Sequence, residues 1–150
     1  MPRTLKHLLI LMLSVTTVFS CSSSDDGSSG NSAILGTWRV LEVTISEQTL
    51  TQRTPNDETL TITFENDGTF SGSTSANTFS GRYQVNNMTL TMLEFTTTEA
   101  ADTTFGGAFY GAIEAAIAPN TTEALFGFSF DGQNLILIFG DQGQMVLEAQ

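Results

Sequence analysis

The chain has 150 residues, one cysteine, one histidine and a formal net charge of −11. Five basic side chains against sixteen carboxylates cannot supply the clustered lysines and arginines that a nucleic-acid backbone requires, so we expect no nucleic-acid partner. A single cysteine allows no disulfide within the chain, so burial of apolar surface must stabilise the fold.

The first 20 residues have the pattern of a bacterial export signal. A basic start is followed by an apolar run at residues 8–19, which as a helix would span about 18 Å and is too short to cross a membrane. The signal ends in VFSC at residues 18–21, which resembles a lipobox and makes Cys21 the lipidated residue. We therefore expect residues 1–20 to be a lipoprotein signal peptide and acyl chains such as palmitate to hold Cys21 on a membrane; the alternative is a secretory signal with a stray cysteine.

Residues 21–32 are expected to form a flexible tether after the lipidated cysteine. The segment is rich in serine and glycine and has no apolar residue after Cys21, so it cannot contribute to a core. Asp25 and Asp26 resemble the acidic signals that route some Gram-negative lipoproteins to the cell surface; the alternative is a tether that is merely soluble. The expected location is the bacterial outer membrane, with the lipid as the membrane contact and surface exposure left open.

Removal of the signal restricts the chemistry that is available. The remaining cations are Arg39, Arg53 and Arg82, against all sixteen carboxylates, so the formal charge becomes −13 and no histidine or lysine is left. Histidine-dependent triads, cysteine nucleophiles, Schiff bases and histidine metal sites are thereby excluded. We expect no enzyme, no catalytic residue, no metal and no cofactor; the remaining enzymatic alternative is a glycan hydrolase with two facing carboxylates.

Residues 33–150 alternate mostly with period two, which is typical of half-buried strands. Strands are expected near residues 38–45, 59–65, 88–92, 126–130, 135–139 and 145–147. The run at 135–139 is apolar throughout, which predicts a strand covered on both faces. In the first strand the apolar phase changes near Val40 and Leu41, which predicts a β-bulge there.

Three short polar segments predict tight turns between the strands. They are Asn66-Asp67-Gly68, Asn86-Asn87 and Asp131-Gly132. Glycine and asparagine tolerate the positive φ that such turns demand. The aspartates lack the spacing of a calcium-binding loop, so we interpret them as turn residues.

One segment, residues 103–118, has the period of a helix. Phe105, Phe109, Ile113 and Ile117 recur every four residues and form one apolar stripe, which we expect to pack on the core. One of residues 102–104 can cap the start, and Pro119 is expected to end the helix.

With this element order, four stretches of sequence resemble the META domain, or HslJ-like, proteins of bacterial envelopes. They are LGTWRV at 35–40, FENDGTFSG at 64–72, NTFSGRY at 77–83 and DGQNLILIFGDQGQMVLE at 131–148. The signature positions are Gly36, Trp38, Gly72, Asn77, Phe79, Gly81 and Tyr83. The resemblance implies a link to stress or drug tolerance and envelope maintenance, with no established catalytic residues.

The chain departs from this family at two positions. Ser75-Ala76 stands where many members have Gly-Cys, and residues 98–101 lack the second cysteine that often precedes the helix. A lipocalin-like protein is the alternative family, because Gly36-Thr37-Trp38 fits the G-x-W entry of those barrels. Lipocalins place their helix after the eight barrel strands, whereas here it interrupts the strands.

The expected fold of residues 33–150 is α+β and mainly β: a strongly curved antiparallel sheet or partial barrel of about eight strands, with one helix inserted before the last three. The expected function is a lipid-anchored, non-enzymatic envelope protein that binds another envelope component. The alternative is a carrier of a small apolar ligand, in a cavity lined by Trp38, Tyr83, Phe126, Phe128 and Phe130, unless these side chains form a filled core. Residues 72–83 are interpreted as a structural hairpin, with Asn77 bonding its own backbone or taking positive φ.

Overall fold

The computed structural model describes residues 31–45 and 50–150. These form a short 3-10 turn, nine strands and one α-helix. Their bounds are η1 (Asn31–Ala33), β1 (Gly36–Ile45), β2 (Leu50–Arg53), β3 (Thr61–Phe64), β4 (Thr69–Ser73), β5 (Thr78–Asn86), β6 (Thr89–Thr97), α1 (Thr104–Ala115), β7 (Ala124–Asp131), β8 (Asn134–Phe139) and β9 (Gly143–Ala149). The predicted signal peptide and nearly all of the predicted tether lie outside the described residues.

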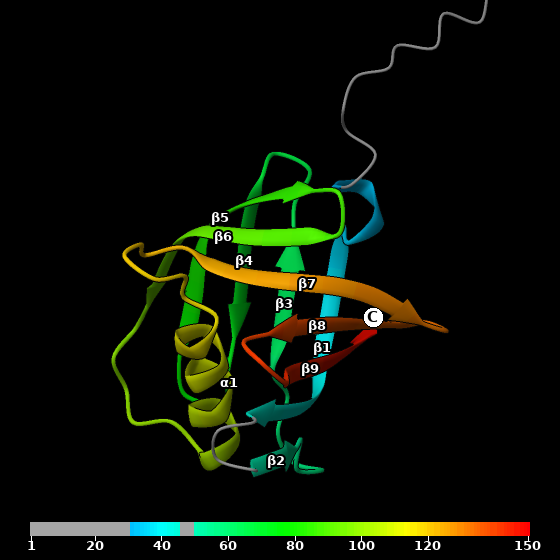
Figure 1. The fold of residues 1–150 in the computed structure, drawn as a ribbon. Helices are drawn as coiled ribbons and strands as arrows, with labels where there is room; N and C mark the ends of the chain where they lie inside the picture. The colour runs from blue at the N-terminus through cyan, green and yellow to red at the C-terminus, as the bar shows by residue number, and fades with distance from the viewer. Residues whose placement is uncertain (1–30, 46–49) are drawn as a thin grey trace, which may run out of the picture.

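Eight antiparallel strands close into a barrel (Figure 1). Neighbouring strands follow the order β1-β3-β4-β5-β6-β7-β8-β9, and β1 also pairs with β9, which completes the ring; β2 is an extra strand on β1. The ring of strand pairings is thus continuous, and the single helix precedes the last three strands as expected. Closure pairs most of the edges that an open sheet of this size would expose.

The predicted bulge in the first strand lets β1 serve three partners. Its register against β9 shifts between Val40 and Glu42, so Leu41 is the extra residue. Before the bulge β1 pairs with β3, and after it β1 pairs with β2. The bulge prediction is confirmed.

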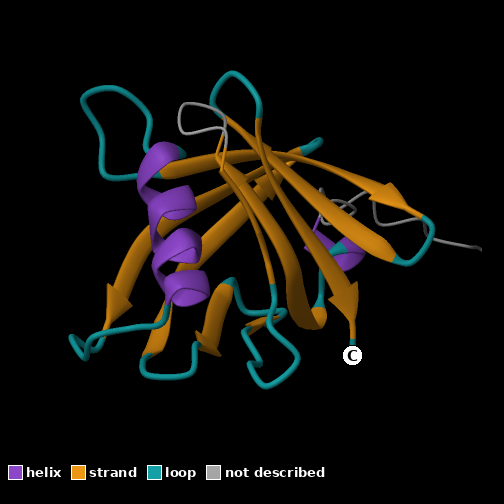
Figure 2. Cartoon of the chain, turned by 90° about the horizontal axis from the view of Figure 1, so that it is seen from below, coloured by secondary structure: helices purple, strands orange, loops and turns teal. Residues whose placement is uncertain are grey.

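Helix α1 lies against the strands at one side of the barrel (Figure 2) and packs on β1, β2, β7 and β9. Thr103 caps it by accepting a hydrogen bond from the Gly106 backbone, and Phe105, Phe109 and Ile113 are buried as predicted. The prediction for Ile117 was wrong, because the helix ends at Ala115 and Ile117 is 43% exposed. None of the helices in the described ranges is long and apolar enough to cross a membrane.

The core is a single apolar cluster inside the barrel and under the helix. The prediction that residues 135–139 are covered on both faces was wrong. Leu135, Leu137 and Phe139 are buried, but Ile138 is 46% exposed. The reason is that α1 packs elsewhere and no second layer covers the outside of β8.

The predicted turns are confirmed by their backbone geometry. Gly68, Asn87 and Gly132 have φ of 80°, 54° and 60°. In the first of these turns, the carboxylate of Asp67 accepts hydrogen bonds from the hydroxyl and the backbone N–H of Thr69, which hold the pKa of Asp67 below its usual value. A second bulge, at Leu93 in β6, was not predicted.

Candidate functional site

The loop between β4 and β5 is a compact turn built on Thr74. The Thr74 backbone N–H donates to the Asn77 carbonyl at 2.9 Å, and the Asn77 N–H donates to the Thr74 hydroxyl, also at 2.9 Å. Residues 72–83 are therefore a hairpin, which confirms their structural interpretation.

The side chain of Asn77 ties this hairpin to the segment that precedes α1. Its Nδ2 donates to the Ala100 carbonyl at 2.8 Å and to Asp102 Oδ2 at 2.9 Å. Its Oδ1 accepts from the Thr98 hydroxyl at 2.9 Å and from the Ala100 N–H at 2.8 Å. The side chain is 5% exposed, and both donors and both acceptor sites of the amide are used. The expectation that Asn77 bonds its own backbone or takes positive φ was wrong, because long-range partners saturate it.

Asp102 is the second centre of this polar cluster. It accepts hydrogen bonds from Thr74 Oγ1, from Asn77 Nδ2 and, at 2.8 Å, from the Thr103 N–H. Burial raises the pKa of Asp102, but these hydrogen bonds outweigh burial and hold the pKa below its usual value. A side chain on Gly106 would overlap the Asp102 carboxylate, so the first turn of α1 is fitted around it.

This cluster lies where the family resemblance would place cysteines. Ala76 precedes Asn77, and residues 98–101 contain the backbone that Asn77 binds. In this chain hydrogen bonds join the two segments: Asn77 uses its whole amide and Asp102 accepts three hydrogen bonds from its own chain. Asn77 and Asp102 therefore have a structural role in this joint.

The two glycines of the hairpin leave room for aromatic rings. A Cβ on Gly72 would overlap the Thr61 carbonyl and the Phe79 ring, and a Cβ on Gly81 would overlap the Glu94 carbonyl and the Phe70 ring. Phe79 and Phe70 are both buried. These glycines are therefore required for packing.

The remaining signature residues also have structural surroundings. Tyr83 donates its hydroxyl to the Glu65 carbonyl at 2.7 Å, and burial raises its pKa. Gly36 has φ of 109°, and Trp38 Nε1 donates to the Ile34 carbonyl at 2.7 Å. Cys21, the predicted lipidation site, lies outside the described residues.

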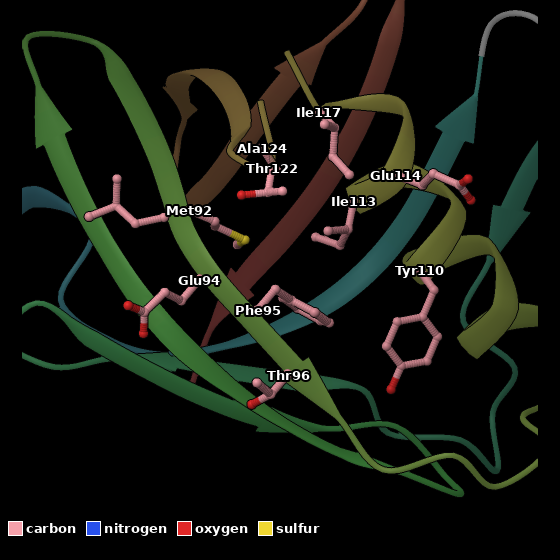
Figure 3. Close-up of a pocket in the computed structure, with 11 residues that line it drawn as sticks. Met92, Glu94, Phe95, Thr96, Tyr110, Ile113, Glu114, Ile117, Thr122 and Ala124 are labelled. Atoms are coloured by element: carbon pink, nitrogen blue, oxygen red, sulfur yellow. The ribbon is translucent and has the colours of Figure 1, made fainter. Parts of the chain in front are cut away.

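A groove of about 570 Å³ opens between β6 and the helix (Figure 3). One wall is a continuous stretch of β6, residues 92–96, and the other is α1 with the chain that follows it. Figure 3 shows Met92 and Phe95 directed toward the side of the groove on which Tyr110 and Ile113 lie. The groove is the space that opens where β7 begins. β6 pairs with β7 only up to Met92, and from there to Thr97 it is paired with β5 alone.

None of the five aromatic residues predicted to line a cavity lies in this groove. Four of them are buried, and they pack on other rings, as Tyr83 does on Phe64 at 5.0 Å and Phe126 on Phe139 at 5.7 Å. Phe130 is 44% exposed and lies 6.3 Å from Trp38. The filled-core alternative therefore describes these residues, and the groove is formed elsewhere. Sequence reasoning missed its β6 wall because the bulge at Leu93 breaks the alternation of that strand.

Two carboxylates stand on the opposite walls of the groove, Glu94 on β6 and Glu114 on α1. Figure 3 shows their side chains directed away from each other and away from the groove. The groove is lined by no arginine or lysine. Within residues 31–45 and 50–150, no three metal-ligating side chains are grouped to hold a metal ion.

A second, polar hollow of about 620 Å³ lies on the outer face of β3 to β6. Its floor is a row of hydroxyls that are neighbours across the strands: Thr63, Ser71, Ser80 and Thr96. Ser80 and Thr96 bond each other at 3.3 Å, and Thr63 bonds Thr37 on the neighbouring strand at 2.8 Å. Such hydroxyls are ordinary on the solvent-facing side of a sheet.

The fold and the groove together define a class: a small antiparallel barrel with a helix inserted after the fifth of its eight strands, β6, and a groove beside that helix. The META domain model matches residues 32–150, so the chain belongs to the META domain family. No functionally curated protein matches the sequence.

Solved structures share the architecture at low sequence identity. A protein from Burkholderia xenovorans matches with a TM-score of 0.60 and 12% identity, over 100% of this chain and 99% of that one. A DUF4847 family protein from Bacteroides vulgatus matches at 0.55 and 21%, over 78% and 94%. A lipocalin-like protein from Bacteroides uniformis matches at 0.51 and 13%, over 78% and 98%. At these identities the similarity establishes the fold alone; a lipocalin-like protein, the alternative family of the sequence analysis, is among the structures that share it.

Proposed function

We propose that the protein is a lipid-anchored, non-enzymatic component of the bacterial outer membrane that binds another envelope component through the groove between β6 and α1. The observation that carries the binding role is the groove itself. Its volume of about 570 Å³ falls within the range of about 300–1,000 Å³ that is usual for ligand sites, and apolar side chains form most of its walls.

The anchor is supported by the VFSC sequence and by the polar tether that follows it. Fractionation of cells that express Cys21→Ser should find the protein outside the membrane fraction, whereas Ser20→Ala, which keeps a small residue before the cysteine, should leave it there. Metabolic labelling with a fatty acid should label the wild-type protein and should not label Cys21→Ser. A membrane-bound, labelled Cys21→Ser protein would refute the anchor.

A binding role fits the available chemistry better than catalysis does. The exported chain has no histidine, no lysine and one cysteine, which the lipid would occupy. The hydrolase alternative needs two carboxylates that face each other, and the two on the groove walls point apart (Figure 3). Asp102, whose pKa is lowered, accepts three hydrogen bonds from its own chain, which assigns it a structural role.

The role in the envelope is tested by deletion of the gene and complementation. Loss of the protein should raise sensitivity to detergent, and the wild type should restore resistance. Ile117→Asp places a charge on an exposed residue that lines the groove just after α1, and this variant should fail to restore resistance to detergent. Leu125→Asp changes a similarly exposed residue outside the groove and should restore resistance. Equal resistance of the deletion strain and its parent would contradict the proposal.

The second candidate function is the carrier of a small apolar ligand, and the same groove favours it. It would bind in the space beside Met92, Phe95 and Ile113, and not among the five core aromatics. Binding of a fluorescent fatty acid that is lost in Ile117→Asp would support this function.

A further inference from the structure

The wall of the groove on the β6 side is an unpaired strand edge. Pairing between β6 and β7 ends at Met92 and Ala124, while β6 continues to Thr97. On its other side β6 remains paired with β5 as far as Thr97 and Phe79. Among the described residues, 93–97 are therefore paired with a strand on one side only, beside the groove.

The direction of the free backbone groups follows from the ladder. The Thr98 N–H donates to the Thr78 carbonyl at 3.1 Å, which marks a hydrogen-bonded pair between the β5 and β6 segments. Hydrogen-bonded pairs alternate along an antiparallel ladder, so Thr96 and Glu94 also face β5, and Phe95 and Thr97 direct their N–H and C=O groups to the other side. For Phe95 that side is the groove, and Thr97 lies one residue beyond the lining of the groove, which ends on β6 at Thr96.

The lining of the groove agrees with this assignment. Four of the five free-edge residues, Leu93 to Thr96, line it consecutively, although alternate side chains of a strand point to opposite faces. Consecutive lining means that the groove runs along the backbone edge. Apolar side chains form its floor and far wall: Met92, Phe95, Tyr110, Ile113, Ile117 and Ala124.

Charge and polarity decide between the occupants that such an edge can take. The tether at residues 22–32 has no apolar side chain to fill the groove and carries two aspartates. Glu94 and Glu114 stand on the two walls with their side chains directed away from the groove (Figure 3), and no basic residue lines it, so a second copy paired edge to edge would bring together two acidic rims of chains that each carry −13 after export. Arg82 faces Glu94 from β5, yet within the described residues the only salt bridge joins Arg53 to Glu42. An occupant with basic ends and alternating apolar residues meets both requirements.

We propose that the free edge of β6 at residues 93–97 binds an extended, basic-ended segment of a partner envelope protein by strand addition, with alternate apolar side chains of that segment in the groove. The segment pairs with the N–H and C=O groups of Phe95 and Thr97. The inference deepens the proposed binding role and rests on it, since it names the chemistry of the envelope component.

The test uses the full-length lipidated protein in detergent micelles and a fluorescent peptide, Lys-Val-Thr-Val-Thr-Val-Lys. The matched control peptide has proline in place of its central valine, which removes one N–H from the added strand. Thr97→Pro removes the free-edge N–H and leaves the pairing with β5, because residues 96 and 98 carry that pairing. Thr97→Ala loses the same hydroxyl contact to Tyr110 but keeps the N–H.

The peptide should bind the wild type and Thr97→Ala alike, and Thr97→Pro about tenfold more weakly, which is the loss of one to two backbone hydrogen bonds. The proline peptide should show a similar loss. Added peptide should slow amide hydrogen exchange at Phe95 and Thr97 of the wild type, a measurement that does not depend on how the variant folds. Substitution of both Glu94 and Glu114 by glutamine should reduce the salt dependence of binding.

Three outcomes would overturn the inference. Equal binding of both peptides, or unchanged exchange at Phe95 and Thr97, would show that no strand is added. Binding of a fluorescent fatty acid in place of the peptide would also overturn it, while the proposed binding role would stand as that of a carrier. If neither probe bound, the groove would lose its role in the proposed function as well.

Discussion

Replacement of Asn77 by alanine tests whether the polar cluster before α1 is a structural joint. The substitution deletes four hydrogen bonds at a side chain that is 5% exposed. It also leaves the Ala100 N–H and C=O and the Thr98 hydroxyl without these partners. Each such bond contributes about 0.5–1.5 kcal/mol net, so the loss is about 3 kcal/mol once water has replaced part of the set.

A loss of this size is a large fraction of the stability of a domain, which is about 5–15 kcal/mol. For a domain of this length it should lower the melting temperature by about 10 °C. The assay is thermal unfolding followed by circular dichroism at pH 7. Asn86→Ala is the matched control, because Asn86 is an exposed asparagine at the end of β5, and it should change the melting temperature by about 2 °C or less.

The pH dependence of a second variant separates hydrogen bonding from volume. Asn77→Asp replaces the Nδ2 donor, which lies 2.9 Å from Asp102 Oδ2, with a carboxylate oxygen. One of the two acids should then have a folded-state pKa above its unfolded value, so the variant should gain stability as the pH falls through that raised pKa. A melting temperature of Asn77→Ala within about 2 °C of the wild type at pH 7, or an Asn77→Asp variant with the pH profile of the wild type, would refute the reasoning.

Three further changes probe the same fold. Hydrogen bonds hold the pKa of Asp102 below its unfolded value near 3.9, so the contribution of Asp102 to the stability of the fold should be present above about pH 4 and lost as the pH falls. Chemical denaturation should therefore find Asp102→Asn less stable than the wild type at pH 7, and the stability of the variant should fall less than that of the wild type below pH 4. Gly81→Ala should lose about 3 kcal/mol in the same assay, since its Cβ would overlap the Glu94 carbonyl and the Phe70 ring. Gly107→Ala adds a Cβ on the exposed face of α1, where it meets nothing within 4 Å, so this variant should gain up to about 1 kcal/mol of stability. A loss of stability would contradict the placement of Gly107 on the exposed face of the helix.

The groove changes what the aromatic content of the chain means. Trp38, Tyr83, Phe126 and Phe128 are buried among other side chains, so an abundance of aromatics indicates a filled barrel and not a calyx. The groove lies outside this core, where β6 extends beyond the start of its neighbour β7. It is bordered by a strand edge and a helix.

Local sequence determined the elements of this protein. Period-two alternation predicted most of the strands, although it missed β2 and the end of β6. Glycine and asparagine predicted the turns, and the four-residue repeat predicted the helix, because each pattern acts within a few residues. A phase change of one residue was enough to predict the bulge at Leu41. The family followed from short motifs whose glycines and aromatics have to fit one another.

Only the tertiary structure decided which faces are covered and where the sheet opens. Leu137 and Ile138 are apolar residues next to each other in β8, yet Leu137 is buried inside the barrel and Ile138 is exposed on the outside. Whether the outer face is covered depends on where the distant helix packs. The partners of Asn77 lie more than 20 residues away, so no local pattern could predict that its amide would be saturated. The unpaired edge at residues 93–97 exists because β7 begins late relative to the end of β6, and that offset is set by how the intervening helix packs against β1 and β9.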